Sequence, residues 1–236
     1  MLNYKYLIIG GGMTADAAVR GIREIDSSGP IGIISAETHP PYNRPPLSKA
    51  LWKGGKFDDI WRKTEAVASV ALHLSTTVDR IDSLRKVAVD QKESEYTYEK
   101  LLLATGGTPR RLPFGGDAVI YFRTLADYQR LRALADKDGR FVVIGGGFIG
   151  SEIAAALRMN GKQVAMIFPE EGIGALAFPR DLSAFVTSYY EQKGVQVIKG
   201  KIVDGIESNG NRIRVHVPGM APIEADGVVA GLGIIP

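Results

Sequence analysis

The residues most suited to chemistry gather in the stretch FVVIGGGFIGSE, from Phe141 to Glu152. An apolar run leads into Gly145, Gly147 and Gly150, and apolar residues at helical spacing follow, which predicts a strand, a tight turn and a helix. One glycine permits the turn, one lets a pyrophosphate approach the backbone, and one lets the helix pack close to the strand. Unpaired amides at the helix start would face the phosphates. The stretch therefore indicates a dinucleotide-binding turn.

An acidic residue stands where such a unit needs one. A further strand is expected from Gln163 to Phe168, and Glu170 lies just past its end, where a carboxylate would meet a ribose hydroxyl. No arginine stands there to receive a 2′-phosphate, and a carboxylate repels one. The sequence therefore predicts that NADH is preferred over NADPH, with Glu171 able to substitute for Glu170.

A second fingerprint lies near the start of the chain. A short apolar strand at residues 4–9 runs into Gly10, Gly12 and Ala15 in the form GxGxxA, and helical spacing follows. The strand after that helix ends at Glu37, about 20 residues past the turn, where a ribose contact is expected. The alternative is that Glu37 is a surface residue at a strand end.

The two fingerprints lie 135 residues apart, which indicates an internal duplication of one nucleotide-binding unit. Two such units suggest two dinucleotides, usually FAD on the N-terminal unit and a nicotinamide on the other, and disfavour dehydrogenases with one fingerprint. The predicted fold is α/β, with two Rossmann-like (βαβ) domains and β-hairpin or meander insertions. A proline- and glycine-rich stretch at 108–123 predicts a hinge, giving domains 1–114 and 115–236.

Two further segments allow two interpretations each. The loop HPPYNRPPLSK carries Arg44 and Lys49 between prolines, which either fixes a cation beside a phosphate or ring, or makes a plain surface loop. The buried run LLLATGG, residues 101–107, either brings small residues and backbone amides beside a nucleotide or is an ordinary strand with a glycine turn.

Composition narrows the classes of function. The chain has 236 residues, 45% hydrophobic and 23% charged, with a formal charge of +3. Opposite charges alternate along it, so no nucleic-acid tail or polybasic membrane patch is expected. No apolar run reaches the roughly 18 residues of a membrane helix, and a cytoplasmic location is expected. The absence of cysteine excludes a thiol redox centre within these residues. The final apolar run, 231–236, predicts that the chain is a fragment.

Taken in order, GGGMTA, ETHPPYNRPPLSK, TYEKLLLATGGTPR, FRTLADYQRLR, GGGFIGSE and FPEEG resemble the FAD-dependent pyridine-nucleotide oxidoreductases of the ferredoxin-reductase type. ATGGTPR and FPEEG are particularly like the apoptosis-inducing-factor branch. The resemblance covers nearly the whole chain. It implies FAD in the N-terminal domain, NADH on the second, and hydride transfer onto the flavin at the domain junction.

The resemblance also implies roles for individual residues. Contacts to FAD are implied for Gly10, Gly12, Thr14, Ala15, Glu37, Arg44, Lys49, Val78, Ala104, Thr105, Gly106 and Arg123. Nicotinamide-side contacts are implied for Gly145, Gly147, Phe148, Ile149, Gly150, Glu152, Glu170 and Gly233. Lys49 and Glu152 would form the catalytic pair beside the reactive edge of the flavin, where the lysine stabilises negative charge and the glutamate holds the lysine. No metal site is expected.

Two departures from the family affect what can be expected. The disulfide reductases of the wider superfamily place cysteine chemistry next to the flavin, which a chain without cysteine cannot do. Family members continue into a second flavin-binding segment with a Gly-Asp motif and a C-terminal domain, so this chain alone is expected to bind FAD weakly or not at all.

Two functions stay open. One is electron transfer from NADH through FAD to a ferredoxin- or rubredoxin-like protein or a quinone. The other is a redox-responsive binding protein of the apoptosis-inducing-factor kind. A homodimer is possible, and a flavin monooxygenase is not expected to carry RPPLSK with ATGGTPR.

Overall fold

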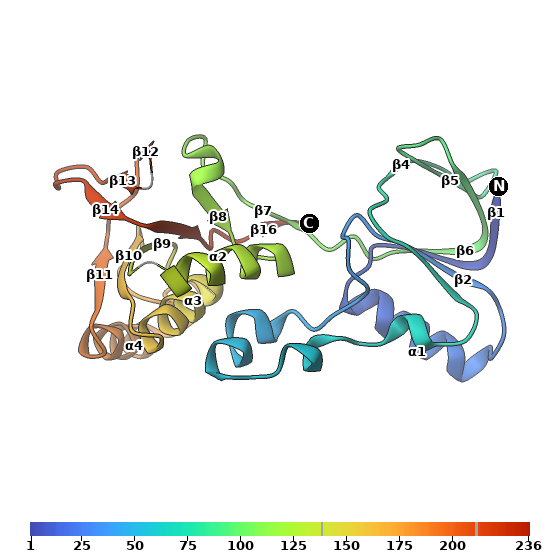
Figure 1. Ribbon diagram of the computed structural model, residues 1–236, viewed down its shortest axis with the longest axis horizontal. Coiled ribbons are helices and arrows are strands. Elements are labelled where there is room, and N and C mark those ends of the chain that lie inside the picture. Colours follow the sequence, from blue (N-terminus) through green and yellow to red (C-terminus); the bar gives the residue numbers. More distant parts are fainter. Residues whose placement is uncertain (138, 211) are drawn as a thin grey trace. The chain divides into compact units, whose positions relative to one another are not determined.

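The protein is described by a computed structural model of residues 1–137, 139–210 and 212–236 (Figure 1). The chain forms two compact units, each built from two stretches of sequence. The first unit contains residues 1–43, 57–107 and the terminal Pro236, and the second contains residues 44–56 and 108–235. The two expected Rossmann-like folds are confirmed, one in each unit. The assignment of 1–114 to FAD and 115–236 to NAD stays a prediction.

The first unit is a six-stranded sheet in the order β3-β2-β1-β6-β5-β4. Its strands are β1 (Leu2–Ile9), β2 (Ile31–Ile34), β3 (Val70–His73), β4 (Val78–Asp82), β5 (Val87–Asp90) and β6 (Glu95–Leu103). The strands β3, β2, β1 and β6 are parallel, whereas β5 and β4 add an antiparallel extension. This parallel core ends its strands at one edge, where a dinucleotide would bind.

Alternation along the strands of the first unit sends apolar side chains to both faces of the sheet. Helix α1 (Met13–Ile25) packs on one face, in a buried cluster of Tyr6, Ile8, Ala15, Val19, Ile31 and Ile33. The other face carries a second cluster of Leu7, Ile9, Ile34, Ala88 and Tyr96. The glycine turn therefore joins a strand and a helix that are both fixed by buried contacts.

The second unit repeats the plan with a five-stranded parallel sheet in the order β11-β10-β9-β15-β8. Its strands are β8 (Val119–Tyr121), β9 (Arg140–Ile144), β10 (Gln163–Phe168), β11 (Val195–Lys199) and β15 (Gly227–Ala230). Its helices are α2 (Leu125–Lys137), α3 (Phe148–Met159) and α4 (Arg180–Gln192). Alternate strand residues such as Phe141 and Val143 face these helices.

An antiparallel meander covers the opposite face of this sheet, as the expected insertion. It consists of β12 (Gly205–Asn209), β13 (Arg212–His216) and β14 (Ile223–Ala225). Val142, Ile144, Ile167 and Val215 belong to the buried cluster between the two layers. A separate two-stranded pair joins β7 (Thr108–Pro109) to β16 (Ile234–Ile235).

Residues 44–56 belong to the second unit although they interrupt the sequence of the first. The Trp52 ring is buried and packs edge-on against Tyr128 of α2 at 5.8 Å, and the Arg132 guanidinium lies 5.2 Å above it. The Asn160 side-chain amide donates a hydrogen bond of 3.1 Å to the Trp52 carbonyl oxygen. These contacts anchor residues 44–56 to the helices of the second unit.

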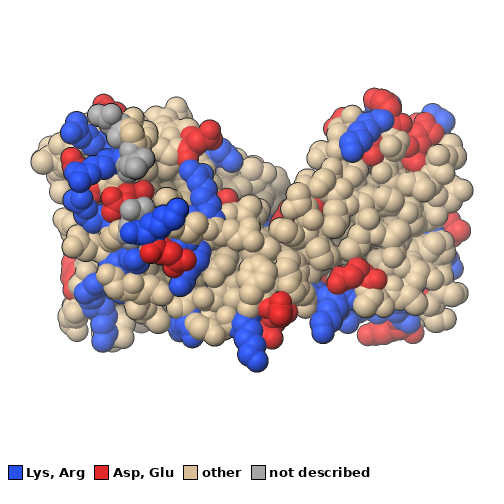
Figure 2. All heavy atoms as spheres, in the orientation of Figure 1, with Lys and Arg blue, Asp and Glu red and all other residues tan. Residues whose placement is uncertain are grey.

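The remaining regular elements are short 3-10 turns. They are η1 (Pro45–Ser48), η2 (Ala50–Lys53), η3 (Phe57–Ile60), η4 (Thr64–Ala66) and η5 (Gly116–Ala118). Within the described residues, no helix has the length and apolar character to cross a membrane, and no cluster of side chains suits a metal ion. On the face drawn in Figure 2, acidic and basic residues are mixed and no broad field of one sign appears.

Candidate functional site: two glycine turns

The first glycine turn leaves an open helix start. Gly10 has φ of +114°, and a Cβ there would lie 2.1 Å from the Ala104 carbonyl oxygen, so only glycine fits. Gly12 is the N-cap of α1, where a Cβ would meet nothing within 4 Å and no side chain caps the helix. Thr14 and Ala15 follow in the first helical turn. The amides of this turn therefore face free space that an anion suits.

The second glycine turn has the same form. Gly145 has φ of +110°, and a Cβ there would lie 2.5 Å from the Gly231 carbonyl oxygen. Gly147 is the uncapped N-cap of α3, again with nothing within 4 Å of a Cβ. Phe148 and Ile149 follow with 59% and 39% of their surfaces exposed. Both turns thus fit a pyrophosphate in the space beside the second glycine of each motif.

Glu37 is held in place by a neighbouring side chain. It is half-buried just past β2, and the Tyr42 hydroxyl donates a hydrogen bond of 2.6 Å to its Oε2. Its own backbone N–H donates to the hydroxyl of the buried Ser35 at 3.2 Å. The carboxylate is therefore oriented before any ligand arrives.

The other residues expected on the flavin side of the first unit lie at strand ends. The Ala104 N–H donates to the Ile9 carbonyl oxygen at 2.7 Å, which continues the pairing of β6 with β1 up to the turn. Thr105 follows outside the sheet, and Gly106 has φ of +72°. Val78 begins β4 and is half-buried. Ala104 and Thr105 lie beside Gly10 of the first turn, and the Thr76 N–H, two residues before Val78, donates to the Ser35 carbonyl oxygen at 2.8 Å.

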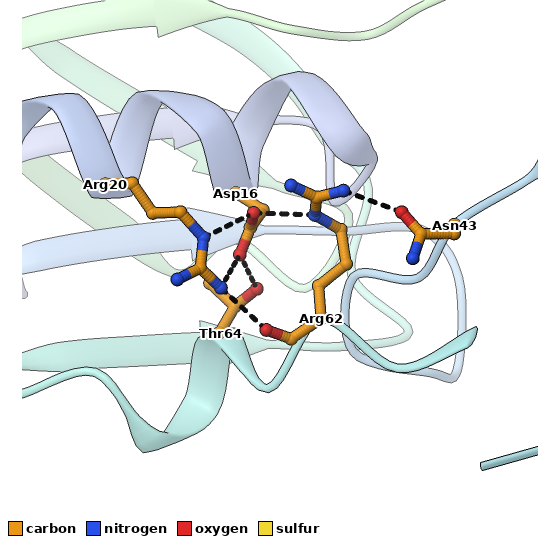
Figure 3. A network of polar contacts seen from close by, with 5 residues as sticks. All are labelled: Asp16, Arg20, Asn43, Arg62 and Thr64. Carbon is orange, nitrogen blue, oxygen red and sulfur yellow. Dashed lines mark hydrogen bonds and ion pairs between the residues drawn. The ribbon is translucent and has the colours of Figure 1, made fainter. Parts of the chain in front are cut away.

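A buried ionic network next to the first turn was not anticipated from the sequence (Figure 3). Asp16 is fully buried and accepts hydrogen bonds from Arg20 at 2.9 Å, Arg62 at 2.6 Å and Thr64 at 2.7 Å. Arg62 also donates to the Asn43 side chain at 2.6 Å. Burial raises the pKa of Asp16, but the bonds from Arg20, Thr64 and Arg62 outweigh it and hold the pKa below its usual range. The network ties α1 to the chain on both sides of residues 44–61.

The expected catalytic pair meets within the second unit. Lys49 Nζ lies 2.7 Å from Glu152 Oε2, and the Ser48 hydroxyl donates to the same oxygen at 2.6 Å. The Lys49 side chain is 53% exposed, so its ammonium stays accessible. Arg44, nearby in sequence, donates to the Arg123 carbonyl oxygen at 3.0 Å. Lys49, Arg44 and Arg123, which the resemblance assigns to flavin contacts, therefore all belong to the second unit.

A small pocket of about 140 Å³ adjoins the second glycine turn. It is lined by Gly146, Gly147, Phe148, Glu170, Gly172, Gly174, Ala175, Leu176 and Ala177. The half-buried Glu170 reaches it, whereas the exposed Glu171 does not line it. Gly233 is not among the residues that line this pocket. It has φ of +84°, and its carbonyl oxygen accepts the Arg110 N–H at 3.0 Å.

Comparisons with known proteins place this geometry in a wider group. A family model described as pyridine nucleotide-disulphide oxidoreductase matches residues 4–236. Peroxisomal monodehydroascorbate reductase 1 of Arabidopsis thaliana is 33% identical over 99% of this chain and 60% of its own length. Mitochondrial apoptosis-inducing factor 1 of Dictyostelium discoideum is also 33% identical, over 99% of this chain and 49% of its own.

Among solved structures, the covalent complex of putidaredoxin reductase with putidaredoxin contains a chain that matches with a TM-score of 0.92 and 30% identity. The match covers all of this chain and 60% of that one. The chain described here thus spans about 60% of the length of the monodehydroascorbate reductases that it matches.

Proposed function

Because the chain belongs to the pyridine nucleotide-disulphide oxidoreductase family, we propose that it acts in a flavoprotein that passes electrons from NADH through FAD to a ferredoxin- or rubredoxin-like protein. The observation that carries the proposal is the pair of open glycine turns, one in each unit. A chain with two such turns can hold two dinucleotides at once, which a hydride transfer between them requires. FAD would supply the chemistry of accepting a hydride and releasing electrons singly.

The residues of the chain have distinct tasks in this proposal. The uncapped starts of α1 and α3 would bind the two pyrophosphates through backbone amides. Glu37 and Glu170 would accept hydrogen bonds from ribose hydroxyls, and Tyr42 holds the first of these carboxylates in position. The first unit would take FAD and the second NADH, following the resemblance.

Lys49 would provide a positive charge for the reaction. Glu152 accepts hydrogen bonds from both Lys49 and Ser48, so the ammonium is fixed in direction while about half of its side chain stays exposed. A preorganised cation stabilises negative charge that develops during hydride arrival. We assign Lys49 this task and Glu152 the task of holding it.

The acceptor is chosen on the likeness to a known electron-transfer pair. The similarity to a chain in the covalent putidaredoxin reductase–putidaredoxin complex supports a small protein acceptor. Because the chain is also similar to monodehydroascorbate reductases, a small radical is a further acceptor to include in the kinetic test. The similarity to an apoptosis-inducing factor supports a second candidate, a redox-responsive binding protein in which turnover is secondary.

Steady-state kinetics on the natural protein that carries this sequence would separate these functions. NADH oxidation is followed with a [2Fe–2S] ferredoxin, a rubredoxin, a quinone and the monodehydroascorbate radical, each at equal concentration. Fast turnover with an iron–sulfur or rubredoxin protein is expected. Slow turnover with every acceptor, together with a long-lived complex with NAD, would favour the second candidate. Failure of NADH to reduce bound flavin at all would overturn the proposal.

A further inference from the structure

Two buried hydroxyl groups on α4 bind the backbone of one residue in the loop after β10. Ser183 and Thr187 lie one helical turn apart and are 4% and 3% exposed. The Ser183 hydroxyl donates to the Ile173 carbonyl oxygen at 2.8 Å, and Thr187 Oγ1 accepts the Ile173 N–H at 2.8 Å. Thr187 in turn donates to the Ser183 carbonyl oxygen at 2.7 Å. Both polar groups of one buried peptide residue are thus satisfied by one helix face.

The fit between this helix and the loop leaves little freedom. A Cβ on Gly172 would lie 2.6 Å from the Ser183 hydroxyl and 2.9 Å from the Thr187 hydroxyl, so the loop backbone rests directly on them. Ile173 itself is 1% exposed, and removal of either hydroxyl would leave a buried backbone group unpaired. Folded chains rarely tolerate such a group, so the loop would shift to find another partner.

The same loop contacts the second glycine turn on its other side. The Gly174 N–H donates to the Gly146 carbonyl oxygen at 2.7 Å, which joins the residue after Ile173 to the middle of the GGG motif. Gly174 has φ of +71° and lies against the Phe178 ring, and that ring packs edge-on to Phe148 at 5.8 Å. A displacement at Ile173 is therefore passed directly to the walls of the pocket.

We propose that Ser183 and Thr187 are positioning residues that set the discrimination between NADH and NADPH, through the loop that carries Glu170. Glu170 lines the pocket three residues before Ile173, and neither hydroxyl lines the pocket. A carboxylate excludes a 2′-phosphate only if it is held where that phosphate would lie. The inference rests on the proposed nucleotide site of the second unit.

The test measures binding of NADH and of NADPH to the full chain by titration calorimetry, without reference to flavin reduction. Thr187→Val and Ser183→Ala should each lower the ratio of the NADPH to the NADH dissociation constant by about tenfold, chiefly by admitting NADPH. Thr187→Ser keeps the hydroxyl and should retain the ratio. Ser188→Ala alters an exposed hydroxyl on the same helix and should leave the ratio unchanged.

A merely structural role would weaken the binding of NADH and of NADPH equally. If the ratio of the NADPH to the NADH dissociation constant stays at the wild-type value in both variants, the proposal is overturned. If Thr187→Val does not fold, Ser183→Ala and Thr187→Ser still decide the question, because only the first should change the ratio. Wild-type binding without preference for NADH also overturns it. Preferential NADH binding without reduction of bound flavin would instead count against the proposed function alone.

Discussion

The two glycine turns share one design but differ in how closely the helix approaches the strands. In the first unit the third motif position and the end of the neighbouring strand are Ala15 and Ala104, whereas in the second they are Gly150 and Gly231. A Cβ on Gly150 would lie 2.1 Å from the Gly145 carbonyl oxygen, and one on Gly231 would lie 2.8 Å from the Gly150 nitrogen. The second turn therefore has no room for the methyl groups that the first contains.

The turns also differ in the polar residues of their helices. One residue after the third motif position, α1 carries the buried Asp16 with its two arginines, whereas α3 carries Ser151, whose hydroxyl donates to the Phe148 carbonyl oxygen at 2.9 Å. One residue further, Ala17 of α1 corresponds to Glu152 of α3, which binds Lys49. Asp16 of the first helix thus anchors that helix to the surrounding chain, whereas Glu152 of the second helix binds a partly exposed lysine. Under the proposed function, the duplicated unit separates a structural task in α1 from a chemical one in α3.

The largest effect is expected at Gly150, the more closely packed of the two third motif positions. Gly150→Ala should destabilise the second unit by about 3 kcal/mol, because the added methyl group meets backbone atoms that cannot move independently. The chain has two tryptophans, Trp52 in the second unit and Trp61 in the first, so urea unfolding of each unit can be followed in a variant that keeps only one. Gly147→Ala, at an open position, is the control and should change stability by less than about 0.5 kcal/mol. Equal losses would remove the claimed difference in helix approach.

The charge of the second helix should affect a rate. Lys49→Ala is expected to slow flavin reduction by NADH by about 10²-fold, equivalent to about 2.7 kcal/mol of barrier, and Glu152→Ala should act similarly. The double variant should lose less than the sum because the two residues act as a unit. Stopped-flow absorbance measures the step, with the exposed Lys53→Ala as a control in the same segment. Reduction of Lys49→Ala at the wild-type rate would make the pair structural.

The charge of the first helix should affect stability and its pH dependence. The pKa of Asp16 is lowered in the fold, so its stabilising contribution is present above its unfolded pKa of about 3.9 and is lost as pH falls through the lower folded value. Asp16→Asn should lower the free energy of unfolding by about 2 kcal/mol at neutral pH. The variant should also lose less stability than the wild type as the pH falls below about 4. Trp61 fluorescence of a Trp52→Phe variant reports this unit.

An exposed ion pair serves as the contrast for this prediction. Arg132 and Asp136 lie 3.0 Å apart on α2, and the Asp136 side chain is 58% exposed. Asp136→Asn should change the stability of the second unit by less than about 0.5 kcal/mol. A neutral-pH loss for Asp16→Asn no larger than this would mean that the buried network does not anchor α1.

Apart from the control variants, the smallest effect is expected for the reciprocal change in the first turn. Ala15→Gly should cost about 0.5–1 kcal/mol, because it loosens a helical residue without relieving any clash. The same unfolding assay with the Trp61 reporter measures it. A loss as large as that of Gly150→Ala would show that the two third positions are equally constrained.

Local patterns allowed much of this fold to be predicted from the sequence. The two strand–glycine–helix units, the acidic residues after the next strands and the meander insertion all follow from periodicity and turn residues within short windows. The pairing of Lys49 with Glu152 came from the resemblance, since 103 residues separate them and no local signal joins them.

The remaining features depend on tertiary contacts that no local sequence pattern indicates. The i,i+4 spacing of Asp16 and Arg20 favours an ion pair, but Arg62, which also donates to Asp16, is 46 residues away in the sequence. No local pattern marks Ser183 and Thr187, whose hydroxyls bond to the backbone of Ile173, 10 and 14 residues earlier. The association of residues 44–56 with the second unit likewise follows from the burial of Trp52 rather than from sequence order.

Because residues 44–56 belong to the second unit, the two units cannot fold in simple sequence order. During synthesis residues 44–56 emerge well before α2 and α3, so Trp52 must wait for partners such as Asn160, 108 positions later. Closing a loop of that length costs about 2 kcal/mol more in chain entropy than closing one of ten residues. Contacts this distant in sequence also slow folding. The second unit should therefore complete its folding after the first. Until then Trp52 should be exposed on the nascent chain, where a chaperone could bind it.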